Sequence, residues 1–136
     1  MIIVTSKKEG LIKKIADRYS LRLLFLFGSQ VAGKTHKESD YDFGYISEKN
    51  LDLEQEGRLI NELIPIAEVK DERMINLVNI KRTTPLLLYA ATSNCQILYE
   101  KEPDEFATLR AYAFKKYIEM KPVYKERARR LNQQIP

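Results

Sequence analysis

The sequence predicts one mixed α/β (α+β) domain, in which helices alternate with strands around a single sheet and a helical extension follows. Its 136 residues suit one domain. Hydrophobic residues make up 44% of the chain and charged residues 31%, a balance typical of a folded protein. Segments with apolar residues at helical spacing alternate with short continuous apolar runs, which favours helices layered on a sheet. We place a core at residues 1–101 and a C-terminal helical extension, packed on the core or on a partner, at residues 102–136.

Each element is predicted from its local pattern. Lys7–Tyr19 has apolar residues at helical spacing, with Ser6 as N-cap and Glu9 completing a capping box. Leu21–Phe27 is apolar except for Arg22 and precedes a glycine, which favours a buried strand. The other elements, in chain order, are strand Tyr41–Ile46, helix Leu51–Ile66 begun near Asn50, strand Met74–Ile80, helix Thr84–Thr92 with Pro85 at its first position, strand Gln96–Tyr99, and helix Glu102–Leu131, which Pro122 should kink or divide.

Composition excludes several classes of function. The single cysteine, Cys95, cannot form an internal disulfide, and the single histidine, His36, excludes a zinc site built from cysteine and histidine within this chain. No apolar run approaches the ~20 residues of a membrane helix, and Lys7 and Lys8 come too early for a signal peptide, so we expect a cytoplasmic protein. The net charge of +4 is compatible with ATP, nucleic acid or an acidic protein and does not choose among them.

A polar, glycine-containing segment after the first strand carries the chemistry and admits two interpretations. In the first, the P-loop pattern G-x-x-x-x-G-K-[ST] is matched by Gly28, Gly33, Lys34 and Thr35. A P-loop directs its phosphates to the N-terminus of a following helix. Only four residues separate Thr35 from Asp40, where a strand begins, so a helix of the usual ~11 residues does not fit. We therefore disfavour this interpretation.

In the second interpretation, Gly28-Ser29 ends one strand and Asp40-Tyr41-Asp42 begins the next. Alternate residues of a strand face the same side, so the two carboxylates lie ~7 Å apart on one face. Both can turn toward shared Mg²⁺ ions, which prefer carboxylate and phosphate oxygens. Gly28 lets the backbone approach a triphosphate, and Ser29 can donate to phosphate oxygens. This plan is typical of two-metal nucleotidyl transfer.

These residues resemble the minimal nucleotidyltransferase (MNT) branch of the DNA polymerase β-type nucleotidyltransferase superfamily. The close similarity covers Phe27-Gly28-Ser29, Gly33 and Ser39-Asp40-Tyr41-Asp42-Phe43. A looser similarity continues through Ile75–Ile80, Pro85 and Ile97–Glu100. The resemblance implies the polymerase β-type core, a mixed sheet flanked by helices.

The resemblance also implies roles for individual residues. Asp40 and Asp42 would be catalytic residues that hold Mg²⁺, and Asn76 would occupy the third catalytic position. The nucleotide, ATP, would be bound by Gly28, Ser29, Gly33, Lys34 and Ser39. The reaction would be attack of a hydroxyl on the α-phosphate, with pyrophosphate leaving. Stand-alone MNT proteins are often antitoxins encoded beside a HEPN-domain ribonuclease toxin, and some adenylylate a tyrosine of that toxin.

One position departs from the family. The third carboxylate usually lies in a pattern such as Asp-Leu-Val-Asp-Leu, where this chain reads Asn76-Leu77-Val78-Asn79-Ile80. An amide oxygen can ligate a metal weakly but cannot accept the nucleophile's proton. Loss of a general base typically costs ~10²–10⁴ in rate. Binding of Mg-nucleotide would survive this loss because Asp40 and Asp42 remain.

The last predicted helix carries an apolar, aromatic-rich stripe and many basic residues. The stripe, at steps of three or four, is Phe106, Leu109, Ala113, Tyr117, Met120 and Tyr124. Such a stripe suits packing on the chain's own sheet and also suits a partner or dimer surface. The basic residues are Lys115, Lys116, Lys121, Lys125, Arg127, Arg129 and Arg130. A run of this kind is usually solvated, and it also suits RNA or an acidic partner.

We therefore expect a Mg²⁺-dependent protein adenylyltransferase that uses ATP and acts as the antitoxin of a HEPN-domain toxin. The alternative is a catalytically weak MNT-fold antitoxin that neutralises its toxin by binding only. A small-molecule nucleotidyltransferase usually needs a further substrate-binding domain, for which 136 residues leave little room. We expect no membrane partner and no direct nucleic-acid binding. The sequence is compatible with a homo-oligomer and does not decide the oligomeric state.

Overall fold

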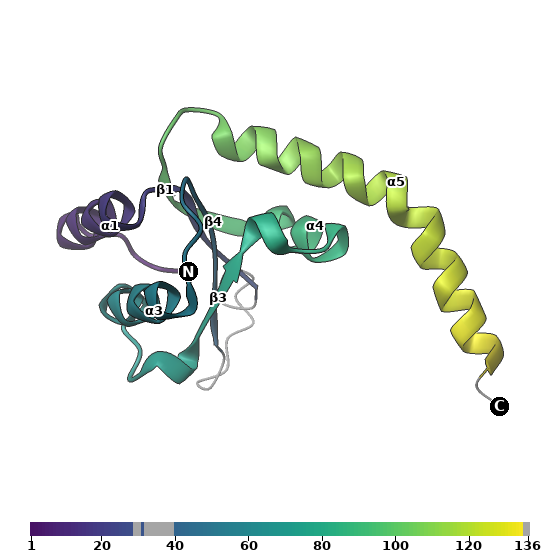
Figure 1. Ribbon diagram of the computed structural model, residues 1–136, viewed down its shortest axis with the longest axis horizontal. Coiled ribbons are helices and arrows are strands. Elements are labelled where there is room, and N and C mark those ends of the chain that lie inside the picture. Colours follow the sequence, from purple (N-terminus) through teal and green to yellow (C-terminus); the bar gives the residue numbers. More distant parts are fainter. Residues whose placement is uncertain (29–30, 32–39, 135–136) are drawn as a thin grey trace.

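The computed structural model describes residues 1–28, 31 and 40–134, which fold into an α/β/α arrangement around one sheet (Figure 1). The strands are β1 (Leu21–Phe27), β2 (Tyr41–Ser47), β3 (Ile75–Asn79) and β4 (Cys95–Glu100). They lie in the order β3-β2-β1-β4. Strand β1 is antiparallel to both neighbours, and β2 is parallel to β3, so the sheet is mixed. The predicted fold class is confirmed.

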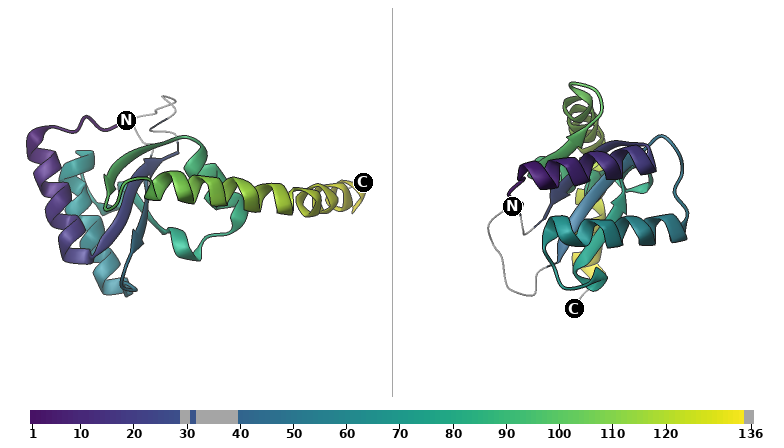
Figure 2. Two further views of the ribbon diagram at one scale, coloured as in Figure 1. Left: turned by 90° about the horizontal axis from the view of Figure 1, so that it is seen from above. Right: turned by 90° about the vertical axis from the view of Figure 1, so that its left-hand side faces the viewer.

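Helices cover both faces of the sheet. The α-helices are α1 (Ser6–Tyr19), α3 (Leu53–Ala67), α4 (Pro85–Ser93) and α5 (Glu105–Gln134), and single 3₁₀ turns lie at Glu72–Met74 and Ile80–Arg82. Helices α1 and α3 pack on one face, and α4 with the first half of α5 covers the other (Figure 2). In the part of the chain that the structure describes, no helix is long and apolar enough to cross a membrane.

Strand β1 is the centre of the hydrophobic core because both of its faces are buried. Leu24 and Leu26 pack in the cluster with α1 and α3. Leu23, Phe25 and Phe27 pack in the cluster with α4 and α5. This two-sided burial explains why the sequence of β1 is a nearly continuous apolar run rather than an alternating one.

Two predicted helix starts are displaced by a neighbouring capping residue. The N-cap of α1 is Thr5, whose hydroxyl accepts from the Lys8 amide at 3.2 Å, so the predicted N-cap Ser6 is wrong by one residue. The N-cap of α3 is Asp52, which forms a reciprocal capping box with Gln55. Helix α3 therefore begins at Leu53, two residues later than the sequence pattern indicates.

The last helix also begins later than predicted and is not divided. Asp104 adopts a left-handed backbone, with φ of 68°, so the helix starts at Glu105 rather than at Glu102. Pro122 lies inside one uninterrupted helix, α5. The ribbon bends along its second half (Figure 1), as expected where proline removes a backbone hydrogen bond.

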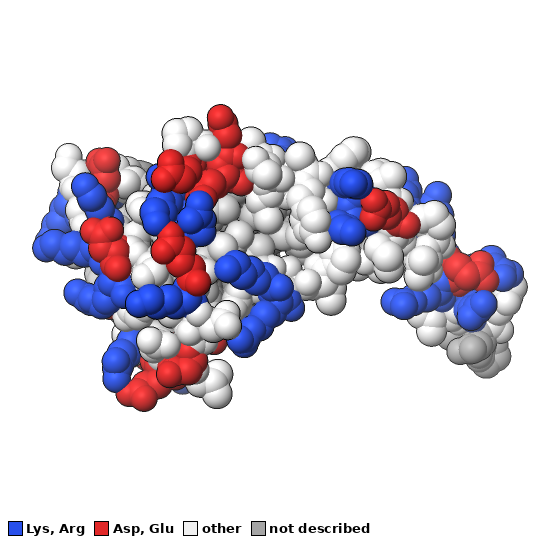
Figure 3. All heavy atoms as spheres, turned by 45° about the horizontal axis from the view of Figure 1, so that its top comes forward, with Lys and Arg blue, Asp and Glu red and all other residues white. Residues whose placement is uncertain are grey.

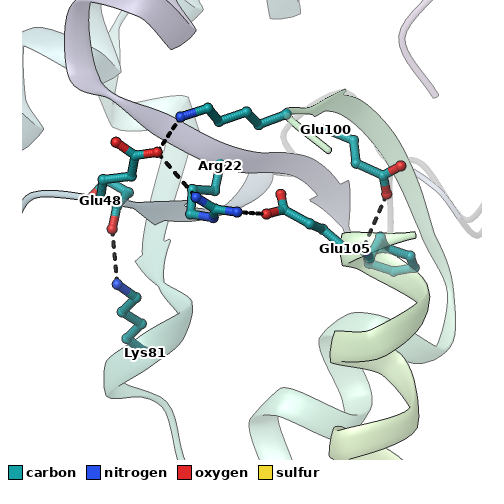
Figure 4. Close-up of polar contacts among 8 residues, drawn as sticks. Arg22, Glu48, Lys81, Glu100 and Glu105 are labelled. Carbon is teal, nitrogen blue, oxygen red and sulfur yellow. Dashed lines mark hydrogen bonds and ion pairs between the residues drawn. The ribbon is translucent and has the colours of Figure 1, made fainter. Parts of the chain in front are cut away.

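A polar network ties the start of α5 to the end of the sheet (Figure 4). Arg22 of β1 pairs with Glu48 at 3.1 Å and with Glu105 in the first turn of α5. Lys101 pairs with the same Glu48, and the Phe106 amide donates to the Glu100 carboxylate at 3.0 Å. The single polar residue of β1 therefore fixes where the long helix begins.

Gly44 offers a test of how tightly the sheet packs on the α4 side. A Cβ at this position would lie 2.7 Å from a ring carbon of Phe25 and 2.9 Å from Cδ1 of Ile80. We expect Gly44→Ala to lower the free energy of unfolding by about 1–3 kcal/mol, because overpacking forces neighbours from their rotamers. Urea denaturation measures the change.

Gly57→Ala is the matched control, because a Cβ at Gly57 in α3 meets no atom within 4 Å. Replacing glycine by alanine inside a helix should raise the free energy of unfolding by about 0.5–1 kcal/mol. If Gly44→Ala were as stable as Gly57→Ala, the close packing described for β2 would be wrong.

Candidate active site

The candidate site lies where β1 ends and β2 and β3 begin. Phe27 of β1 is opposite Asp42 of β2, and Asp42 is beside Asn76 of β3 in the parallel pairing. Asp40 lies directly before β2. Three strands therefore bring Gly28, Asp40, Asp42 and Asn76 to one edge of the sheet.

The Asn76 amide joins the two carboxylates. Its Nδ2 donates to Asp40 Oδ2 at 3.3 Å and to Asp42 Oδ1 at 3.1 Å. One amide group can reach both only because Asp40 and Asp42 project from the same side of the chain, as alternate residues of an extended strand do. The structure thus brings together the three residues that the sequence predicts as the catalytic set.

Position 28 must be glycine for two reasons. Its backbone φ is +84°, in the left-handed region that favours glycine. A Cβ there would lie 2.4 Å from Oδ2 of Asp42. The sequence motif indicates a glycine that admits a phosphate, and the structure adds that this glycine also makes room for a carboxylate of the site.

The Asp42 carboxyl is in an environment that opposes its ionisation. Partial burial is the main cause that raises its pKa, and the negative charge of Asp40 raises it further. The hydrogen bond from Asn76 acts in the opposite direction. A cation between these carboxylates would relieve both effects, so the site favours a bound positive ion.

The residues fit Mg²⁺ as a pair of carboxylates with an amide beside them, since Mg²⁺ is usually held by one or two carboxylates together with substrate phosphates. Asp40 and Asp42 would be the ligands that carry charge. Among the described residues, no group of three histidine, cysteine, aspartate or glutamate side chains is placed to hold a metal ion. The third position is an amide here, which matches the departure noted at Asn76.

Four predicted nucleotide-binding residues, Ser29, Gly33, Lys34 and Ser39, lie outside the described residues. Their roles remain predictions. Of the residues assigned to the nucleotide from the sequence, Gly28 alone belongs to the described part of the chain.

A family model described as "Polymerase beta, Nucleotidyltransferase" matches residues 10–104, which include β1, β2, β3 and the whole candidate site. The chain belongs to the polymerase β nucleotidyltransferase family. The match supports the second interpretation of the Gly28 segment over the P-loop. A comparison with curated protein sequences gives no match.

Several solved structures share this nucleotidyltransferase fold. A chain of a toxin–antitoxin complex with AMP-PNP aligns with a TM-score of 0.67 and 19% identity, covering 87% of this chain and 96% of that one. A chain of the MntA–HepT toxin–antitoxin complex aligns with a TM-score of 0.62 and 16% identity, covering 90% and 97%. A chain of the complex of a tri-AMPylated HEPN toxin from Shewanella oneidensis with its MNT antitoxin aligns with a TM-score of 0.60 and 17% identity, covering 87% and 93%. The family model confirms the predicted polymerase β nucleotidyltransferase family, and these structures confirm the predicted fold.

The contact of Asn76 with both aspartates can be tested through stability. We expect Asn76→Asp to lower the free energy of unfolding at pH 7 by about 1 kcal/mol. The reason is that the substitution removes the donor shared by Asp40 and Asp42 and adds a third negative charge. Urea denaturation in the presence of a chelator measures the change in the free energy of unfolding.

The loss should shrink at acid pH, and the sign follows from the direction of the Asp42 shift. Its pKa is raised in the folded protein, so ionisation costs stability above that pKa, and the cost disappears as the group is protonated. Asn79→Asp adds the same charge at the far end of β3, where the side chain can still accept from the Lys81 amide. The described contact would be contradicted if Asn76→Asp lowered the free energy of unfolding equally at pH 7 and near pH 4, or if Asn79→Asp lowered it as much as Asn76→Asp does.

Proposed function

We propose that this chain is a Mg²⁺-dependent nucleotidyltransferase that acts as an antitoxin by transferring AMP from ATP to a tyrosine hydroxyl of a HEPN ribonuclease toxin. The observation that carries the proposal is the pair Asp40 and Asp42, held beside Gly28 and Asn76 at one edge of a polymerase β-type sheet. The neighbours in solved toxin–antitoxin complexes support the choice of partner.

The chemistry is substitution at the α-phosphorus of ATP. The acceptor hydroxyl oxygen forms a bond to this phosphorus, the bond to the bridging oxygen of the β-phosphate breaks, and pyrophosphate leaves. Bound Mg²⁺ would supply neutralisation of phosphate charge. Asp40 and Asp42 would hold the cation, and Gly28 leaves space for the Asp42 carboxylate. Asn76 cannot accept the hydroxyl proton, since an amide has no basic oxygen, so the proton passes to water.

The second candidate is an antitoxin of the same fold that neutralises its partner by binding alone. Asn76 favours it, because this residue replaces the family's third carboxylate with a group that donates to the other two. Both candidates bind the toxin, and they differ in whether AMP transfer occurs.

Labelled ATP separates the two. The chain is incubated with Mg²⁺, the purified product of the adjacent gene, and ATP labelled on either the α- or the γ-phosphate. We expect α-label to appear on the partner protein. A stable complex without label would favour the binding-only antitoxin, and transfer of γ-label would return the P-loop interpretation and overturn the assignment of Asp40 and Asp42.

Replacing the aspartates tests their role directly. We expect Asp40→Asn and Asp42→Asn each to abolish detectable transfer, because each removes a charged ligand for the cation. The control is Asp17→Asn, which removes one charge from an exposed residue of α1 far along the chain from the site. Transfer that persists in the double variant Asp40→Asn with Asp42→Asn would be incompatible with the proposal.

Restoring the third carboxylate tests the role of Asn76. In Asn76→Asp we expect the rate of α-label transfer to rise, by up to the ~10²–10⁴ that a general base contributes. Asn79→Asp, with the same added charge on β3, should leave the rate within about twofold of the starting protein, because a charge outside the catalytic set has no proton to accept. No gain in Asn76→Asp would show that the amide is not what limits transfer.

A further inference from the structure

Helix α5 carries one apolar stripe along its whole length. Steps of three and four residues extend the stripe past Tyr124 to Leu131, so that its positions are Phe106, Leu109, Ala113, Tyr117, Met120, Tyr124, Arg127 and Leu131, and Arg127 is its one charged position. Its first half is covered by the body of the protein: Phe106 and Ala113 are buried in the cluster with α4, and the Tyr117 ring stacks on Tyr89 of α4 at 4.0 Å. The first half therefore packs as a normal amphipathic helix.

The second half of α5 continues beyond the body, as Figures 1 and 2 show. Met120 lines a groove beside Pro85 and Leu88 of α4. Beyond it, within the described chain, the hydrogen bonds, ion pairs and ring contacts of residues 121–134 are all with other α5 residues. Leu131 is 59% exposed. This segment of α5 is about 21 Å long, and most of the stability of helices in proteins comes from packing of an apolar face.

The projecting end also holds the net charge of the protein. Residues 121–134 contain five lysine and arginine residues and one glutamate, a net charge of +4, and the rest of the chain has eighteen of each sign. Glu126 pairs with Arg129 and Arg130. Lys121, Lys125 and Arg127 have no ion-pair partner among the described residues. Figure 3 shows blue side chains gathered on this end of the molecule.

Arg127 lies within the stripe itself, three residues after Tyr124 and four before Leu131. In helix–helix contacts, positions at this spacing face the partner. A cation there selects a partner that offers an acidic group, since an apolar group opposite would leave the guanidinium without a counter-charge. Lys125 lies about 200° around the helix from Arg127, away from the stripe.

A second copy of this chain is a poor occupant because two segments of charge +4 would repel each other. Neutralising that charge requires an acidic surface, and covering Tyr124 and Leu131 requires an apolar one. We infer that residues 121–134 are the docking surface for an acidic amphipathic helix of a protein partner, with a carboxylate opposite Arg127. The inference rests on the proposed function only in taking this partner to be the proposed AMP acceptor.

The test measures binding without ATP or Mg²⁺, so it does not depend on transfer. The full chain is titrated by calorimetry with the purified product of the adjacent gene, at two salt concentrations. The variants are Arg127→Gln and Leu131→Ser on the stripe, with Lys125→Gln as the matched control, which removes the same charge from the opposite side of the helix. Circular dichroism confirms that each variant retains its helices.

We expect Arg127→Gln and Leu131→Ser each to weaken binding by roughly tenfold or more, because each removes a contact on the buried side. Lys125→Gln should stay within about threefold and mainly reduce the dependence on salt, as expected for a charge at the rim. Failure of the proposed function would give a different result: the partner would bind through this stripe but would receive no α-label from ATP.

Three outcomes would overturn the inference. The first is that Arg127→Gln and Lys125→Gln weaken partner binding equally and that the starting protein binds a poly(U) oligonucleotide. This result would indicate a nucleic-acid surface. The second is concentration-dependent self-association by light scattering that Leu131→Ser abolishes, which would indicate a second copy. The third is absence of partner binding, or binding that none of the substitutions changes.

Discussion

Strand β2 is hydrogen-bonded on both sides, and its register with β1 and β3 is the constraint on which the candidate site depends. This register places Phe27, Asp42 and Asn76 in one row across three strands. The register is strongly fixed because Phe43 and Tyr45 are fully buried on the side of α1 and α3. A slip of one residue would move these rings to the side of α4, where Gly44 already lies against Phe25 and Ile80, and would bring the aspartates under α1 and α3, at the cost of burying unpaired charge.

Local patterns in the sequence were sufficient to predict most elements, because each has its own signal. The two-sided burial of β1 appears as an unbroken apolar run, and the start of α4 is marked by Thr84 and Pro85. The order of the strands could not be predicted, since α4 could lead β4 to either edge of the sheet. Ends of helices were displaced where two adequate caps compete, as Thr5 and Ser6 do, because small differences in backbone direction decide between them.

The residue types of the site were predictable, whereas their contacts were not. Asp40 and Asp42 are close in sequence and share a face by strand geometry alone. The amide of Asn76 reaches them only through the parallel pairing of two strands that α3 separates, and no local pattern encodes that distance. The same holds for Gly28, whose space is filled by a carboxylate from the next strand. Ser29, Gly33, Lys34 and Ser39 stay predictions because they lie outside the described residues.

The uneven distribution of charge affects how this molecule is oriented as it approaches a partner. A body with equal numbers of positive and negative side chains carries a cationic arm at one end, so the protein has a large electric dipole moment along α5. In the field of an acidic surface such a molecule experiences a torque as well as an attraction, and it rotates until the cationic end of α5 points toward that surface. At low ionic strength this orientation acts over roughly 10–30 Å and shortens the search for a productive encounter, and added salt suppresses it.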